Sequence, residues 1–134
     1  MKLYADEPGH RAVRALERIV VSCLARVEVP AALWRMQRRG ELGDAELRVL
    51  VAEFEADYLG TPGEPPRFLV TGLPSSVLET AAHLLVSHAL RAYDAIQLAS
   101  ACAVRDADPG CAVFACADRA LRAAAAAEGF EVLP

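Results

Sequence analysis

The stretch that decides the fold of this chain is LRAYDAIQLA, residues 90–99. Asp94 stands just ahead of residues 95–104, a run that is apolar on nearly every side, and a helix without a polar face is a buried helix. The simplest role for Asp94 is that of an N-cap, whose carboxylate accepts hydrogen bonds from the first backbone N–H groups of the helix. Ser or Asn would cap equally well, so this position alone assigns no function.

Two further carboxylates stand in comparable places. Asp118 follows the apolar run 112–116 and opens a helix expected over residues 119–128, and Glu28 has apolar neighbours one helical turn away. Buried carboxylates are costly without a partner, and a shared divalent cation commonly offsets that cost. Hard oxygen ligands favour Mg²⁺ or Mn²⁺ over zinc. Glu28, Asp94 and Asp118 form the candidate ligand set, and such an ion would suit hydrolysis of a phosphodiester.

Length and composition indicate one soluble domain over residues 1–134. The chain is 54% hydrophobic and 24% charged, which is ordinary for a globular protein. A net charge of −4 gives no bulk attraction to a polyanion, although a local arginine patch could supply one. Lys2 is the only lysine among the 14 Lys and Arg residues, so phosphate contacts would come mainly from arginine.

The cysteines and the hydropathy pattern point to the cytoplasm. Cys23, Cys102, Cys111 and Cys116 have no metal-ligand spacing and are expected to be reduced thiols. No stretch is long and apolar enough for a membrane span.

Short apolar runs alternate with helical patterns along the whole chain. This order predicts an α/β fold with a mostly parallel sheet covered by helices on both faces. The site should then lie outside the carboxyl ends of the strands, where Asp118 falls. Strands are expected at 19–21, 68–70, 112–116 and 130–133, and helices at 10–18, 23–39, 45–59, 76–88, 95–104 and 119–128.

Four blocks, in order, resemble PIN-domain ribonucleases of the VapC toxin type. RAYDAIQLA (91–99) resembles the family's third block, and VEVPAAL (27–33) resembles the block that carries its Glu. FACADRAL (114–121) resembles the last block, and KLYADEPG (2–9) resembles the segment after the first block. Several motifs in the right order are far more specific than any one of them.

The resemblance implies a PIN-like three-layer fold and an Mg²⁺- or Mn²⁺-dependent endoribonuclease, the toxin of a toxin–antitoxin pair. Glu28, Asp94 and Asp118 match the family's acidic residues, so they are expected to be both catalytic residues and metal ligands. Tyr93 is expected to pack or hydrogen-bond beside the site, and Asp6 is a second-rank candidate. The implied partners are an RNA substrate, a cognate antitoxin protein and a second copy of the chain.

The antitoxin is expected to cover the acidic cleft with an extended or helical tail. The amphipathic stretch 45–59 is expected to pack in the core or in a helix hairpin, and its Phe54 and Tyr58 also offer an apolar wall for such a groove.

The family's first block has no counterpart here. PIN domains usually open with a strand that ends in an Asp, within a pattern like Asp-[Thr/Ser]-Ser-Ala, and this chain begins after that point. We therefore expect Met1 to be an internal start, with about ten or more residues upstream that contain the first Asp. Without that ligand, the 134 residues are expected to cleave RNA weakly or not at all.

Two alternatives remain open at this stage. In the first, the chain is a catalytically impaired PIN-fold module that binds RNA or a protein partner and keeps its acids as caps. In the second, it is an unrelated α/β enzyme that uses the acids as general acid and base. A pure binder would gain little stability from Mg²⁺ or Mn²⁺, and an acid–base enzyme would remain active in EDTA.

Overall fold

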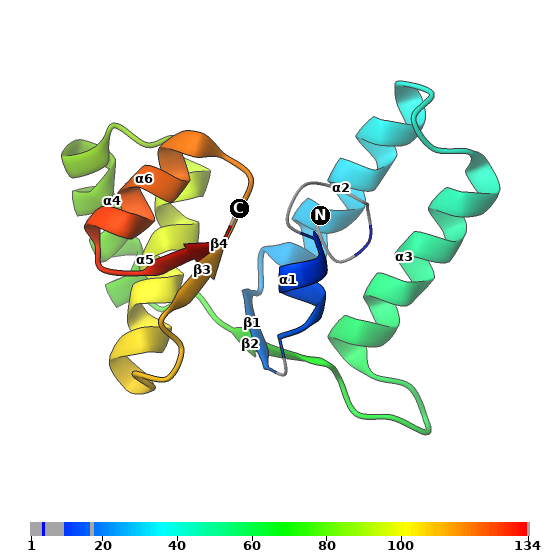
Figure 1. Ribbon diagram of the computed structural model, residues 1–134, viewed down its shortest axis with the longest axis horizontal. Helices are drawn as coiled ribbons and strands as arrows, with labels where there is room; N and C mark the ends of the chain where they lie inside the picture. Colours follow the sequence, from blue (N-terminus) through cyan, green and yellow to red (C-terminus); the bar gives the residue numbers. More distant parts are fainter. Residues whose placement is uncertain (1–3, 5–9, 17, 134) are drawn as a thin grey trace. The chain divides into compact units, whose positions relative to one another are not determined.

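A computed structural model describes residue 4, residues 10–16 and residues 18–133 of the chain (Figure 1). The chain divides into two compact units, Met1–Val70 and Thr71–Pro134. Helices alternate with short strands along the sequence, which confirms the predicted α/β class. That residues 1–134 form one domain stays a prediction.

The first unit pairs two strands into a small sheet and packs two long helices on each other. The strands lie where the β-branched and apolar runs predicted them, and the expected long helix runs through Pro30 without a restart. Its elements are α1 (His10–Arg14), β1 (Ile19–Ser22), α2 (Ala25–Arg38), α3 (Asp44–Leu59) and β2 (Phe68–Thr71).

An aromatic cluster lies in the core of the first unit. The fully buried ring of Phe54 lies 5.9 Å from that of Tyr4, 5.6 Å from that of Tyr58 and 6.4 Å from that of Phe68, measured between centroids. The Tyr4 hydroxyl donates to Asp57 Oδ2 at 2.7 Å. Burial, followed by this hydrogen bond, raises the pKa of the Tyr4 phenol far above its ordinary value.

The predicted groove wall of Phe54 and Tyr58 is therefore wrong. Phe54 is 0% exposed, and Tyr58 packs against the same cluster. The periodic apolar residues of α3 are used for the core of their own unit, because burial there removes a large aromatic surface from water.

The second unit packs three helices with a two-stranded parallel sheet (Figure 1). In that sheet Val113 pairs with Glu131 and Ala115 pairs with Leu133. The parallel arrangement confirms the predicted direction for these two strands. The elements are α4 (Ser75–His88), α5 (Ala92–Ala107), β3 (Val113–Ala115), α6 (Arg119–Ala127) and β4 (Glu131–Leu133).

Helix α5 lies at the centre of the second core. Ala95, Leu98 and Ala99 are each at most 1% exposed, which confirms the buried helix predicted from residues 95–104. Helices α4 and α6 both pack on α5. The other buried members of this core are Val77, Ala81, Leu84, Leu90, Leu121, Ala124, Ala125 and Phe130.

Polar contacts join the end of α6 to the end of α4 and to α5. His88 Nε2 lies 2.7 Å from Glu128 Oε1. The Arg105 guanidinium donates to the Glu128 carbonyl at 2.6 Å and lies 4.2 Å from the centre of the Phe130 ring. The Arg105 contact satisfies one carbonyl group at the end of α6 and adds a cation–π interaction beside the core.

All four cysteines lie in the described part of the chain and are thiols, as predicted. In the described residues, no helix combines the length and the apolar character that a membrane crossing requires.

The end of α4 gives a test of backbone strain. Ala89 follows this helix in the left-handed conformation, with φ 50° and ψ 38°. A Cβ atom disfavours that conformation and glycine does not. Ala89→Gly should therefore raise the free energy of unfolding by about 0.5–1 kcal/mol, measured by urea denaturation.

The same substitution at Ala82, an exposed position inside α4, is the control. Ala82→Gly should lower the free energy of unfolding by about 1 kcal/mol. An Ala89→Gly protein as unstable as the control would show that Ala89 carries no strain.

Candidate active site

Asp94 lies in the first turn of α5, directly before the most buried part of the helix. The helix begins at Ala92 and its N-cap is Arg91, so the prediction that Asp94 is the N-cap is wrong. The helix starts earlier than the apolar pattern suggested, because the backbone of Arg91 is extended and its carbonyl accepts from the N–H of Ala95. A carboxylate in the first turn still interacts favourably with the helix dipole.

Asp118 follows β3 and caps α6, as predicted. Its Oδ1 atom accepts a hydrogen bond from the backbone N–H of Leu121 at 2.8 Å. Leu121 is itself buried in the core of the second unit. The cap therefore sets the orientation of the Asp118 carboxylate relative to a fixed helix.

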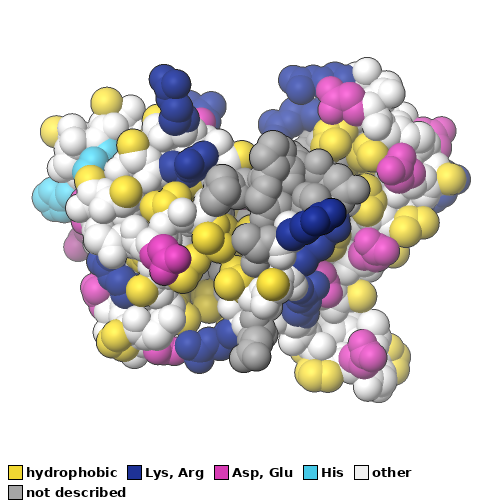
Figure 2. Space-filling model, in the orientation of Figure 1, with side chains coloured by type: hydrophobic (Ala, Val, Ile, Leu, Met, Phe, Trp, Pro, Cys, Tyr) yellow, Lys and Arg dark blue, Asp and Glu magenta, His cyan; other side chains and the backbone are white. Residues whose placement is uncertain are grey.

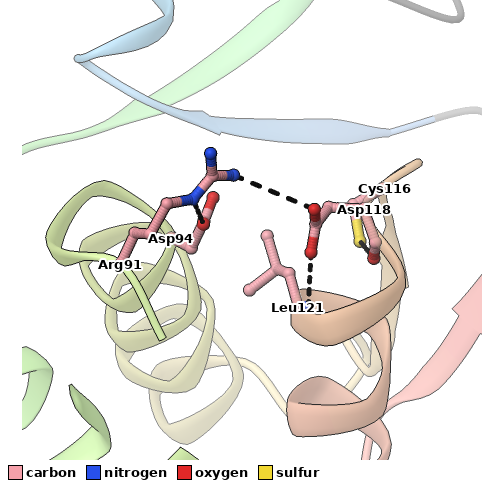
Figure 3. Close-up of polar contacts among 5 residues, drawn as sticks. All are labelled: Arg91, Asp94, Cys116, Asp118 and Leu121. Atoms are coloured by element: carbon pink, nitrogen blue, oxygen red, sulfur yellow. Dashed lines mark hydrogen bonds and ion pairs between the residues drawn. The ribbon is translucent and has the colours of Figure 1, made fainter. Parts of the chain in front are cut away.

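A single guanidinium joins these two carboxylates (Figure 3). Arg91 Nε lies 2.8 Å from Asp94 Oδ2, and Arg91 Nη2 lies 3.8 Å from Asp118 Oδ2. The hydrogen bond to Asp94, followed by the charge of that carboxylate, raises the pKa of Arg91 above its ordinary value. The structure thus brings two of the three predicted acids to one positive charge.

Exposure differs sharply across this trio. The side chain of Asp94 is 13% exposed and that of Asp118 is 44% exposed, whereas the side chain of Arg91 is 79% exposed. Removing a carboxylate from water is costly unless an opposite charge compensates it. Asp94 therefore has the strongest need for a cation, and Arg91 meets that need from the solvent side.

The donor chemistry of this pair fits Mg²⁺ or Mn²⁺. Two carboxylate oxygens from separate helix N-termini already face one cation. Mg²⁺ sites in proteins are commonly built from one or two carboxylates completed by water and substrate phosphates. Within the described part of the chain, no three His, Cys, Asp or Glu side chains gather as a metal-holding group.

The remaining predicted residues stand as follows. Glu28 is half-buried in the first turn of α2, in the first unit, and its meeting with the two aspartates stays a prediction. Tyr93 lies next to Asp94 on α5, and its hydroxyl accepts from Gln97 at 3.5 Å. Asp6 lies outside the described residues.

The role of Arg91 was not predicted from the sequence. Its position three residues before Asp94 could have indicated an ion pair, because residues three apart meet on one side of a helix turn. The contact with Asp118 spans two elements and could not be read from spacing.

No family model matches the chain. Two curated relatives do, Ribonuclease VapC45 of Mycobacterium tuberculosis strain CDC 1551 / Oshkosh and Ribonuclease VapC49 of strain ATCC 25618 / H37Rv. Each is 37% identical over 139 residues, an alignment that covers 100% of this chain and 89% of the relative. The chain belongs to the VapC family of PIN-domain ribonucleases.

Membership in the VapC family confirms the resemblance found in the motif blocks and, with the alternating strands and helices, the PIN-like α/β fold. Arg91 joins Asp94 to Asp118. These two aspartates lie in the blocks at 91–99 and 114–121, which resemble the family's blocks that carry an Asp.

The two roles of Asp118 can be separated by substitution. Asp118→Asn keeps an oxygen that accepts from Leu121, so the free energy of unfolding should change little. Asp118→Ala removes the cap and should lower that free energy by about 1 kcal/mol. Urea denaturation of both proteins without added metal measures the difference, and equal stabilities would contradict the capping role.

Proposed function

We propose that this VapC-family chain is an endoribonuclease that depends on Mg²⁺ or Mn²⁺ and acts as the toxin of a toxin–antitoxin pair. The family relationship supports cleavage of RNA, because both relatives are named as ribonucleases. The observation that carries the metal dependence is the meeting of Asp94 Oδ2 and Asp118 Oδ2 at the guanidinium of Arg91. Two acids that share one monovalent cation are suited to share a divalent one.

In this proposal Asp94 and Asp118 hold the ion, and Glu28 completes the acidic set. The core holds Asp94 in place through its buried neighbour Ala95, and the cap to Leu121 orients Asp118 so that Oδ2 faces the site. A divalent ion bound there would stabilise the negative charge that develops on the phosphodiester during hydrolysis. The protein's contribution is to keep the carboxylates ionised, oriented and close together.

RNA cleavage with and without metal tests this proposal. Any cleavage of single-stranded RNA by the parent in Mg²⁺ or Mn²⁺, however weak, should be lost in EDTA. Asp94→Asn and Glu28→Gln should each lower the rate by about 100-fold or more, because an ion that stabilises the transition state contributes several kcal/mol. Gel analysis of end-labelled RNA measures the rates.

Asp106→Asn is the matched control, because Asp106 is an exposed aspartate at the other end of the same helix. It should cleave like the parent. Activity that persists in EDTA would favour general acid–base chemistry. Folded protein that binds RNA without cleaving it at any metal concentration would favour the binding module.

The same proposal includes an antitoxin partner and a homodimer. Hydrophobic side chains reach the surface of both units (Figure 2). On α2, Val27 is 71% exposed and Trp34 is 49% exposed, and a separation of seven residues places them on one face of the helix. We take this face of α2 as the candidate contact surface for a partner.

Trp34 gives a specific readout, because it is the only tryptophan of the chain. The product of the neighbouring open reading frame should co-purify with the chain and shift the Trp34 fluorescence to shorter wavelength. Sedimentation should show a dimer of the chain alone. If the chain sediments only as a monomer, the homodimer is contradicted. If the product of the neighbouring open reading frame stays in the unbound fraction, the antitoxin partner is contradicted.

A further inference from the structure

The positive charge in this site comes from a side chain of the protein, the guanidinium of Arg91. Arg91 contacts the carboxylates of two different elements, Asp94 at the start of α5 and Asp118 at the start of α6 (Figure 3). Its side chain is 79% exposed, so water surrounds the guanidinium on most sides. A guanidinium only donates hydrogen bonds, so the Arg91 side chain cannot accept from the free N–H groups of α5, although Arg91 is the N-cap residue. Its contacts in the site are the ion pairs with the two acids.

We propose that Arg91 is a positioning residue that acts as a resident cation, which a divalent metal must displace from the two aspartates. This inference rests on the proposed function, because it concerns the same carboxylates. In the metal-free protein the guanidinium keeps the carboxylates facing one point. When a divalent ion binds, the guanidinium leaves, and the affinity of the site for metal is set by this exchange.

Charge balance supports the exchange. Two carboxylates and one guanidinium leave one uncompensated negative charge, which attracts a further cation to the pair. A divalent ion between the carboxylates would instead leave Arg91 within a few ångströms of a like charge, and this repulsion is substantial even in water. Because the Arg91 side chain is exposed and flexible, it can turn to solvent without disturbing the core.

A purely structural role makes a different prediction. If Arg91 only held α5 and α6 together, its removal would loosen the carboxylates and weaken metal binding. If Arg91 occupies the place of the metal, its removal strengthens metal binding while destabilising only the metal-free protein. The sign of the change in metal affinity therefore separates the two roles, and no RNA cleavage is needed to observe it.

The test is a titration with Mn²⁺ alone, followed by the electron paramagnetic resonance signal of the unbound ion. Arg91→Met removes the charge and keeps most of the length, and it should bind Mn²⁺ about 5- to 10-fold more tightly than the parent, the size expected for charges a few ångströms apart in water. Arg91→Lys keeps the charge and should bind like the parent. The difference between Arg91→Met and the parent should shrink as salt screens the repulsion.

Arg119→Met is the control for general charge, because Arg119 is exposed and follows Asp118 directly in the first turn of α6. It should change the Mn²⁺ affinity by less than about twofold, because exposed charges beyond direct contact are screened. Thermal unfolding adds a second readout. Arg91→Met should unfold at a lower temperature than the parent without metal, and saturating Mn²⁺ should remove most of that difference.

The outcomes separate the two proposals. If the parent and all variants fail to bind Mn²⁺, the proposed function is overturned, and this inference falls with it. If the parent binds Mn²⁺ and Arg91→Met binds it equally or more weakly, the resident-cation role is overturned and the proposed function stands.

Discussion

The packing of α5 in the second core is the constraint on which the site depends. Ala95 and Leu98 are fully buried, and Asp94 directly precedes them in the first turn of the same helix. The helix cannot rotate to expose its acid without exposing its apolar residues, which would lose favourable burial of apolar surface. The carboxylate is thus held at the edge of the core by the residues that follow it in sequence.

That position leaves a nearly buried negative charge, which the side chain of Arg91 compensates. A carboxylate that is only 13% exposed requires compensation, and Arg91 supplies it at 2.8 Å. The same guanidinium reaches towards Asp118, whose other oxygen is occupied by the cap of α6. Folding and chemistry therefore use different atoms of one side chain: Oδ1 of Asp118 holds a helix, and Oδ2 faces the cation.

Local patterns in the sequence predicted the elements well, and contacts between elements were predicted poorly. The strands at Ile19–Ser22 and Phe68–Thr71 and the cap at Asp118 follow from residue type and immediate neighbours. The N-cap of α5 was misplaced by three residues, because the helix start depends on the extended backbone at Arg91 rather than on hydropathy. Core packing of Phe54 was expected and is confirmed, but its second expected role as a groove wall is wrong, because periodicity shows that a face is apolar without showing what covers it.

Alanine is the most frequent residue in the core beneath the site. Ala95 and Ala99 of α5 and Ala124 and Ala125 of α6 are all buried, and these two helices carry the two aspartates. Methyl groups allow neighbouring helices to approach closely, and a close-packed interior leaves no room for extra carbon atoms. A larger residue at any of these buried positions would force the surrounding helices to shift and so disturb the placement of the carboxylates that they carry. The placement of the charged groups thus depends on the volumes of the buried side chains. Substitution of these alanines, which do not contact the substrate, would then be restricted in evolution as substitution of the aspartates is.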